Sequence, residues 1–422
     1  MNKGVYSEVY GCSANVADQE IALGLLKKNG FKLVNDTSRS DLNIIFTCTV
    51  KTPTLNRMIY RIRELTKLNK PLIVAGCMPK TEKEVIEKIN PNTSMIGPNS
   101  IEKIVDTAHA TMRGKKVTFL EDLKKPKVCL PRVRKNPIID IITVSTGCLN
   151  RCSFCSVNFA RGKLFSFPED MILEEVKQAI NDGCKELYIT SQDNSCYGRD
   201  IGTNLANLLD KICKTDGKFL IRVGMMNPLH LKDILNDLIC VYQNEKIFKF
   251  LHLPVQSGSN NILKMMNRGY TVRDFKNITK DFVKNVPSLT LSTDVIVGFP
   301  GETDKDFQMT VELIKKVKPD IVNISKFGAR PKTKAAEMGQ LPVNVINQRS
   351  KELMGIVKKI QLEKNKKWIG WEGEVLIDET KNKNVIGRNF AYRPIILKEG
   401  KLGEFRNVRI ETVSSTSLFS ES

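Results

Sequence analysis

Two kinds of hydrophobic pattern alternate along the first 120 residues of the chain. Short apolar or β-branched runs of strand length are separated by stretches in which apolar residues recur with helical spacing. The strand-like runs are Val5–Gly11, Leu42–Thr47 and Pro71–Gly76, and the helical stretches are Ala17–Lys28 and Asn56–Lys67. Strand–helix–strand alternation predicts a doubly wound parallel sheet. We therefore expect an N-terminal α/β domain over residues 1–120.

The same alternation continues over residues 136–335. The strand-like runs are Ile138–Val144, Glu186–Thr190, Phe219–Val223, Phe248–Leu253, Leu289–Val297 and Asp320–Ile324. The helical patterns between them are Glu169–Asn181, Leu229–Tyr242, Val272–Lys284 and Thr303–Val317. Six βα units predict a partial (β/α)6 barrel, in which functional groups lie at the carboxyl ends of the strands.

The C-terminal part of the chain has a third pattern. A helical stretch beginning at Pro342 predicts a connecting helix over residues 340–367. Short strand-like segments broken by glycines follow: Glu372–Asp378, Asn384–Asn389, Arg393–Lys398 and Asn407–Thr412. They predict a small antiparallel β-barrel over residues 368–414, a fold that often binds RNA. Its aromatic residues could stack on bases or form the barrel core: Trp368, Trp371, Phe390 and Tyr392.

The chain is strongly basic, with a formal net charge of +20. This charge indicates a polyanionic partner such as nucleic acid, unless it only reflects a lysine-rich proteome. The connector 113–135 is rich in lysine and arginine, and predicts either a basic strip along a nucleic-acid backbone or a solvated linker. Other basic candidates for substrate contact are Arg161, Lys163, Lys326, Arg330, Lys332 and Lys334. Without a long apolar segment or a signal-peptide pattern, we expect a cytoplasmic protein and no membrane span.

Cysteines provide the strongest chemical signal. In a chain of this kind, 11 cysteines indicate metal binding or catalysis before disulfides. Cys148, Cys152 and Cys155 follow the first barrel strand with the spacing C-x3-C-x2-C. Three thiolates occupy three irons of a 4Fe–4S cluster and leave the fourth iron open for chemistry. A zinc knot or three core cysteines are alternatives, although zinc sites usually have paired cysteines or histidines, and no histidine lies nearby.

A second set of cysteines is spread over the N-terminal domain. Cys12, Cys48 and Cys77 each end a predicted strand. Because the carboxyl ends of parallel strands meet in one crevice, we expect these three residues to lie together and to hold a second cluster. The alternative is three cysteines that are merely buried at strand ends. Cys129 remains unassigned, and the cysteines interpreted as packing residues are Cys184, Cys196, Cys213 and Cys240.

These motifs resemble a known family. The loop C-x3-C-x2-C after a strand resembles the signature of radical S-adenosylmethionine (SAM) enzymes. Residues 145–162, His252–Ser259 with Met266–Arg268, and Asp294–Glu302 resemble the methylthiotransferase branch. Residues 155–164 and 10–15 are similar to its archaeal and eukaryotic type. The C-terminal segment resembles the RNA-binding TRAM domain, so the resemblance covers almost the whole chain.

The resemblance implies a function and its cofactors. That branch methylthiolates carbon 2 of N6-threonylcarbamoyladenosine, at position 37 of tRNA beside the anticodon. It implies SAM and two 4Fe–4S clusters, one at Cys148, Cys152 and Cys155 and an auxiliary one at Cys12, Cys48 and Cys77. Reductive cleavage of SAM would yield a 5′-deoxyadenosyl radical, and Gln192, Gln256 and Asp294 would face SAM. The implied partners are the tRNA anticodon stem-loop and an electron donor such as a flavodoxin or ferredoxin.

Other interpretations stay open on the sequence. The same chemistry serves enzymes that modify isopentenyladenosine in tRNA or an aspartate of a ribosomal protein. A different class is a non-enzymatic RNA-binding protein stabilised by metal. His252 is a candidate ligand or base, although a histidine in a strand is more often a hydrogen-bonded core residue. No acid–base residue and no oligomeric state follow from these patterns.

Overall fold

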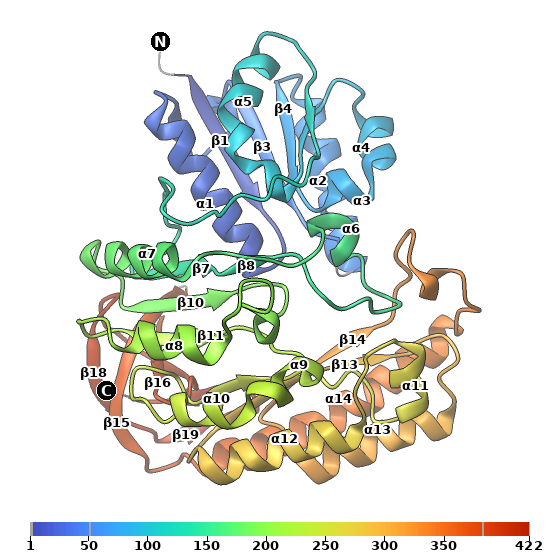
Figure 1. Cartoon of the computed structure of the whole chain (residues 1–422), viewed down its shortest axis with the longest axis vertical. Coiled ribbons are helices and arrows are strands. Elements are labelled where there is room, and N and C mark those ends of the chain that lie inside the picture. The colour runs from blue at the N-terminus through green and yellow to red at the C-terminus, as the bar shows by residue number, and fades with distance from the viewer. Residues whose placement is uncertain (1–2, 50–51, 382–383, 422) are drawn as a thin grey trace.

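The computed structural model describes residues 3–49, 52–381 and 384–421. Figure 1 shows an N-terminal α/β domain standing on a layer of barrel strands and helices, with a C-terminal sheet at one side. No helix in the described ranges is both long and apolar enough to cross a membrane. The chain has the α/β class, and the parallel sheets expected from the alternating patterns are present.

The N-terminal sheet is parallel throughout, with the strand order β2-β1-β3-β4-β5-β6. Its strands are β1 (Gly4–Val9), β2 (Lys32–Val34), β3 (Leu42–Thr47), β4 (Leu72–Gly76), β5 (Ser94–Ile96) and β6 (Thr118–Phe119). The order changes direction between β1 and β3, which is where open α/β sheets bind ligands. Cys12, Cys48 and Cys77 directly follow or closely follow β1, β3 and β4.

Helices cover both faces of this sheet. They are α1 (Ser13–Lys28), α2 (Thr52–Lys67), α3 (Met78–Thr81), α4 (Lys83–Ile89) and α5 (Ile104–Met112). Side chains alternate across β3: Ile44 and Phe46 join one core cluster with residues of α1 and α5, whereas Ile45 joins another with residues of α2 and α4. Burial on both faces explains why this strand reads as a continuous apolar run.

The barrel strands follow one another in sequence order. They are β7 (Ile139–Thr143), β10 (Glu186–Thr190), β11 (Leu220–Val223), β12 (Phe250–His252), β13 (Thr290–Val297) and β14 (Ile321–Lys326), and all their pairings are parallel. A bridge between Ile221 and Ile247 joins the two three-stranded halves. Each strand lies within a few residues of its predicted range. The outer helices include α7 (Glu169–Asn181), α8 (Leu205–Cys213), α12 (Val272–Asn285) and α13 (Asp304–Val317).

One predicted barrel helix is interrupted. The pattern over Leu229–Tyr242 corresponds to α9 (Pro228–Leu231), a 3-10 turn (Lys232–Ile234) and α10 (Leu235–Val241). Ile234 has φ −121°, which is not helical, so the chain changes direction there. The apolar periodicity does not record this break because both pieces still bury side chains, such as Leu231 and Leu238, in the same core.

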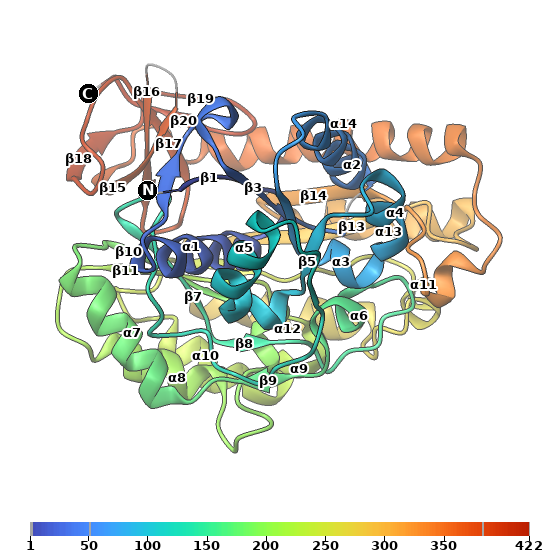
Figure 2. The same ribbon diagram turned by 90° about the horizontal axis from the view of Figure 1, so that it is seen from above.

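The C-terminal segment is reached through the long helix α14 (Val343–Lys366), which Figure 2 shows running across the molecule toward that sheet. The sheet has the order β18-β15-β16-β17-β20-β19. Its strands are β15 (Glu372–Lys381), β16 (Asn384–Asn389), β17 (Pro394–Leu397), β18 (Phe405–Arg409), β19 (Thr412–Val413) and β20 (Leu418–Phe419). The pairing of β17 with β20 is parallel, and the others are antiparallel. The sequence patterns did not predict β20, which lies beyond residue 414.

The aromatic residues of this segment mostly pack inside it. Trp368, Trp371 and Phe390 contact one another, and Trp368 is buried in the core. Tyr392 packs against Phe248 of the barrel, and its hydroxyl lies 2.8 Å from the Tyr188 hydroxyl. The core interpretation is therefore correct for Trp368, while Phe390 keeps 38% of its surface exposed.

Candidate functional site

The C-x3-C-x2-C loop lies between the short strand β8 (Ser145–Thr146) and helix α6 (Val157–Arg161). Cys148, Cys152 and Cys155 are all partly buried. Cys148 and Cys152 both raise the pKa of the Cys155 thiol. Burial is the main cause that raises the pKa of Cys148 to about 11 and that of Cys155 to about 12. The three sulfurs thus lie together in a place where thiolates need positive charge or hydrogen-bond donors.

Two side chains supply those donors. Arg268 Nη1 donates to Cys152 Sγ over 3.1 Å, and the backbone N and Nδ2 of Asn150 each lie 3.4 Å from Cys148 Sγ. Arg268 is 7% exposed, and its Nε donates to the Tyr270 hydroxyl over 3.1 Å. No carboxylate pairs with Arg268 in the described part of the chain. A buried cation without a carboxylate, aimed at a cysteine sulfur, fits a loop that holds an anionic iron–sulfur group.

Asn150 is oriented by residues from the segments that follow the next two barrel strands, β10 and β11. Its Nδ2 donates to Asp193 Oδ2 over 2.8 Å, and its Oδ1 lies 3.1 Å from His230 Nε2. Asp193 also accepts from Ser195 and from Cys196 Sγ, the latter over 3.2 Å. Cys196, interpreted from the sequence as a packing residue, is therefore part of the polar support of the cysteine loop.

The residues expected to face SAM come from both halves of the barrel: Gln192 and Gln256 follow β10 and β12, and Asp294 lies within β13. Asp294 Oδ1 accepts from His252 Nε2 over 3.1 Å and from Asn323 Nδ2 over 2.8 Å. Gln256 lies beside it, because Gln256 N donates to Asp294 O over 2.8 Å. Gln192 follows β10 in the other half, and its buried Oε1 has no hydrogen-bond partner among the described residues. The structure thus brings Gln256 and Asp294 together, and Gln192 offers an unused acceptor.

The second set of cysteines is gathered at the carboxyl edge of the N-terminal sheet. Thr47 O, one residue before Cys48, accepts from Cys77 N over 2.9 Å. Burial is the main cause that raises the pKa of the Cys77 thiol to about 11, and the neighbouring Cys48 and Cys12 thiols add to this rise. Gly11 has φ +110°, and a Cβ there would lie 2.4 Å from the Cys48 Cβ. Glycine is required at this position, because any side chain would push the loop of Cys12 away from Cys48.

The segments that follow the two cysteine sets contact each other. Thr49 Oγ1 lies 3.3 Å from Ser156 Oγ, and both hydroxyls are buried. Thr49 follows Cys48, and Ser156 follows Cys155. Helix α3, which begins just after Cys77, packs against α6, and Figure 1 shows the two helices close together. Arg330 Nη2 adds a further link by donating to Thr52 Oγ1 over 2.9 Å.

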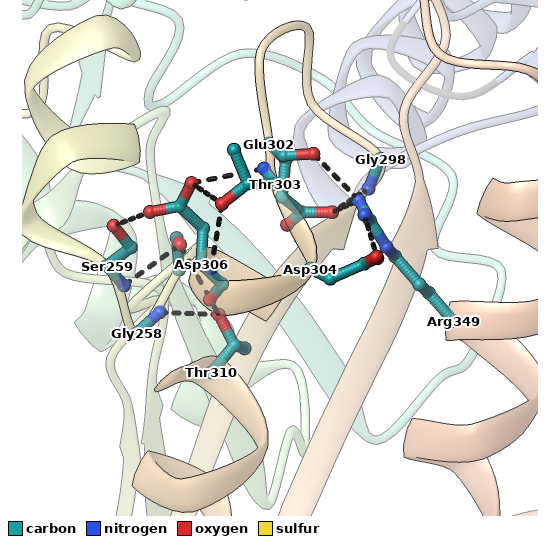
Figure 3. A network of polar contacts seen from close by, with 10 residues as sticks. Gly258, Ser259, Gly298, Glu302, Thr303, Asp304, Asp306, Thr310 and Arg349 are labelled. Atoms are coloured by element: carbon teal, nitrogen blue, oxygen red, sulfur yellow. Dashed lines mark hydrogen bonds and ion pairs between the residues drawn. The ribbon is translucent and has the colours of Figure 1, made fainter. Parts of the chain in front are cut away.

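A buried ionic network holds the loop after β13. Glu302 accepts from Gly298 N and from Arg349 Nη1, each over 2.8 Å. Arg349 Nη2 reaches Asp304 over 2.7 Å. Figure 3 shows the Arg349 guanidinium between the two carboxylates. Helix α14 thereby fixes the segment Asp294–Glu302 that the sequence singled out.

A second network ties this loop to the segment after β12. Ser259 Oγ donates to Asp306 Oδ1 over 2.5 Å, and Gly258 N donates to Thr310 Oγ1 over 2.8 Å. Asp306 also forms a capping box with Thr303 at the start of α13, as Figure 3 shows. The residues after Gln256 are therefore anchored on α13, which supports a preorganised barrel mouth.

Several basic residues proposed as substrate contacts are not available for that role. Arg161 is 2% exposed and pairs with Asp18, and Arg330 is also buried. In the connector, Lys127 pairs with Asp18, and Arg132 pairs with Asp140. For Lys127 and Arg132, the basic-strip and solvated-linker interpretations are both wrong, because these side chains form ion pairs inside the protein. The single candidates that remain exposed are Lys163, Lys326, Lys332 and Lys334, and the exposed basic residues of the connector are Arg113, Lys115, Lys116, Lys124, Lys125 and Lys135.

Replacing Arg268 with glutamine tests the donor to Cys152. If this loop holds an iron–sulfur cluster, we expect its affinity for iron to fall about 10- to 100-fold, the usual effect of removing a hydrogen-bond partner of a metal ligand. Iron released to a chelator from anaerobically prepared protein measures this change. Arg273→Gln, an arginine on the surface of α12, is the matched control. Equal iron release from both variants would contradict a role for Arg268 at the loop.

Comparison with known proteins agrees with this arrangement. The model of the Radical SAM superfamily matches residues 142–314, and that of the Uncharacterized protein family UPF0004 matches residues 4–97. The probable threonylcarbamoyladenosine tRNA methylthiotransferase of Pyrococcus horikoshii is 44% identical over 422 residues, covering 99% of both chains. The threonylcarbamoyladenosine tRNA methylthiotransferase of Homo sapiens is 35% identical over 98% of this chain and 73% of its own length.

A solved structure supports the fold. The radical S-adenosylmethionine methyltransferase TsrM from Kitasatospora setae superposes with a TM-score of 0.59 at 15% identity, over 79% of this chain and 75% of its own. The barrel and its C-x3-C-x2-C loop define a radical SAM protein, with SAM and 4Fe–4S clusters as the cofactors of the superfamily. Within it, the chain belongs to the family of threonylcarbamoyladenosine tRNA methylthiotransferases.

Proposed function

We propose that this protein methylthiolates carbon 2 of N6-threonylcarbamoyladenosine at position 37 of tRNA. The observation that carries the proposal is the meeting of the two cysteine sets through Thr49 and Ser156 in a chain of this family. One set would serve the radical step and the other the delivery of sulfur, so the two must lie near one substrate. The relatives reported above are named for threonylcarbamoyladenosine, which favours it over isopentenyladenosine or a ribosomal-protein aspartate.

The cysteines would divide between two clusters. Cys148, Cys152 and Cys155 would hold the cluster that binds SAM, and Cys12, Cys48 and Cys77 would hold the auxiliary cluster. Both sets fit this assignment by donor chemistry, since each offers three sulfurs and leaves one iron without a protein ligand. When bound, the clusters and SAM would supply a radical able to react at a C–H bond and a sulfur atom to replace the hydrogen, and a separate SAM would supply the methyl group on that sulfur.

The chain's own residues orient and shield these groups. Arg268 and Asn150 hold the sulfurs of Cys152 and Cys148, and Asp193 fixes Asn150. Gln192, Gln256 and Asp294 would bind the polar parts of SAM at the mouth of the barrel. The networks around Glu302 and Asp306 keep that mouth rigid, which limits the reorganisation needed during reaction.

The substrate would approach as an anticodon stem-loop. The net charge of +20 favours association with the tRNA backbone. Exposed Lys332 and Lys334 lie near the segment that contacts the N-terminal domain through Arg330 and Thr52. The C-terminal sheet, proposed as a TRAM-like module over residues 368–414, would provide a second RNA contact. A flavodoxin or ferredoxin is the proposed electron donor, and the cytoplasm the proposed location.

The direct test is a reaction with tRNA that carries N6-threonylcarbamoyladenosine. Protein prepared without oxygen, SAM and dithionite are added, and the nucleosides are separated by mass. We expect the 2-methylthio derivative from this tRNA and none from the same tRNA with isopentenyladenosine at position 37. Methylthio product only on isopentenyladenosine, or SAM cleavage without product on either tRNA, would contradict the proposal.

A further inference from the structure

Arg161 is the centre of a buried ionic group between the two domains. It ends helix α6 of the barrel domain and is 2% exposed. Its Nη2 donates to Asp18 Oδ2 and to Asn15 Oδ1, each over 2.9 Å. Lys127 Nζ reaches the same carboxylate, and also donates to Pro98 O over 3.3 Å. Lys127 and Asp18 are buried as well.

This group has more positive than negative charge. Arg161 and Lys127 are two cations, and Asp18 is the one carboxylate that pairs with either among the described residues. The buried Nη1 of Arg161 also has no hydrogen-bond partner in the described ranges. An excess charge shielded from water is unfavourable unless an anion lies close to it.

The cysteines of the N-terminal domain are the nearest source of that anion. The charge of Arg161 lowers the pKa of the Cys77 thiol, and the Cys77 and Cys12 thiolates in turn favour the charged form of Arg161. Asn15, the other acceptor of Arg161, donates to Thr47 O over 2.7 Å and to Tyr10 O over 2.8 Å. These carbonyls precede Cys12 and Cys48, and Thr47 O also accepts from Cys77 N over 2.9 Å, so one hydrogen-bond path joins Arg161 to the loops of all three cysteines.

A 4Fe–4S cluster held by Cys12, Cys48 and Cys77 would supply the negative charge that this arrangement requires. Three thiolates outweigh the positive charge of an oxidised 4Fe–4S core, so the loaded site is an anion. One-electron reduction makes it more negative, and a buried cation beside it favours the reduced form. Three neutral thiols would leave the excess charge of Arg161 and Lys127 without a partner.

We propose that Arg161 is a positioning residue that serves as the countercharge of the Cys12, Cys48 and Cys77 site. The inference rests on the proposed function to the extent that the N-terminal cysteines hold a cluster. It assigns to a barrel residue control over the group bound by the other domain.

The test is a redox titration of the N-terminal site alone. In the full-length chain, Cys148→Ala, Cys152→Ala and Cys155→Ala together leave only that site, and dithionite titration is followed by electron paramagnetic resonance. Arg161→Gln is expected to make reduction about tenfold less favourable, a shift of about 59 mV to lower potential for a one-electron couple. Arg161→Lys, which keeps the charge, is expected to retain most of the parent potential.

Two further variants sharpen the comparison. Asp18→Asn removes the carboxylate and increases the excess positive charge, so the potential is expected to rise. Arg268→Gln is the matched control, because its sulfur partner belongs to the other set and is absent from this background. An unchanged potential in Arg161→Gln, or an unchanged or lowered one in Asp18→Asn, would overturn the inference.

The same experiment separates this inference from the proposed function. If the background protein binds no iron, the assignment of a cluster to the N-terminal cysteines fails, and the countercharge role fails with it. If the background protein binds iron but its reduction potential does not change in the Arg161 and Asp18 variants, only the countercharge role fails. Should Arg161→Gln not fold, the opposite shift expected for Asp18→Asn still decides the question.

Discussion

Cys77→Ala will eliminate the methylthio product while SAM cleavage continues. Cys77 belongs to the set at the edge of the N-terminal sheet, and the radical step is proposed for the Cys148, Cys152 and Cys155 loop. The iron content should fall from about eight to about four atoms per chain. Nucleoside mass analysis and deoxyadenosine measurement in the same reaction give both quantities.

Two matched variants define the controls for this experiment. Cys152→Ala should eliminate both deoxyadenosine and product, because it removes one of the three sulfurs proposed to hold the SAM-binding cluster. Cys213→Ala, a buried cysteine in α8 far from either set in the sequence, should leave both unchanged. Methylthio product from Cys77→Ala at the parent level would refute the division of labour between the two sets.

Arg349→Met is expected to lower the free energy of unfolding by about 3–5 kcal/mol, the usual cost of removing one partner from a buried ion pair. The side chains of Arg349 and Glu302 are 7% and 1% exposed. Removing the guanidinium leaves the Glu302 carboxylate buried beside Gly298 N alone. Urea unfolding monitored by tryptophan fluorescence measures the loss.

The pH dependence of this variant has a definite sign. Burial already raises the pKa of Glu302 in the folded parent, with Arg349 opposing that effect. Without Arg349, the folded chain binds a proton at Glu302 more readily than the unfolded chain does. The stability deficit should therefore shrink as the pH falls.

An exposed pair provides the control for the ionic network. Lys318 and Glu363 lie 3.0 Å apart with side chains 54% and 62% exposed. Lys318→Met should change stability by about 0–1 kcal/mol, because water screens such pairs. Equal losses from Arg349→Met and Lys318→Met would contradict the importance assigned to the buried network. Adding Glu302→Gln to Arg349→Met should recover part of the loss, because it removes the unpaired charge.

The local elements of the fold were readable from the sequence. Strands β10 and β16 and helix α7 have the bounds that the patterns predicted. Burial on both faces makes parallel strands read as apolar runs, and a helix with one buried face repeats its apolar positions. Short elements with few residues, such as β19 and β20, carried no such signal.

The gathering of the cysteine sets was predictable to a similar degree. Cys148, Cys152 and Cys155 are close because a short loop leaves them no alternative. Cys12, Cys48 and Cys77 required one further step, the rule that parallel strands end at a common edge. The inference for each cysteine set depends on local pattern and on the topology of the sheet. Both can be inferred from a sequence in which strand and helix patterns alternate.

Only the tertiary structure decided which polar residues support the site. Arg161 looked like a surface contact for tRNA, yet it is buried against Asp18, 143 residues away along the chain. Arg268 reaches Cys152 across 116 residues, and Thr49 meets Ser156 across 107. The sequence determined the strands, the helices and the gathering of the two cysteine sets, because these depend on local pattern and on the order of the strands. Whether a charged side chain is exposed or buried in an ion pair depends on partners that are distant in the sequence. No local pattern identifies those partners.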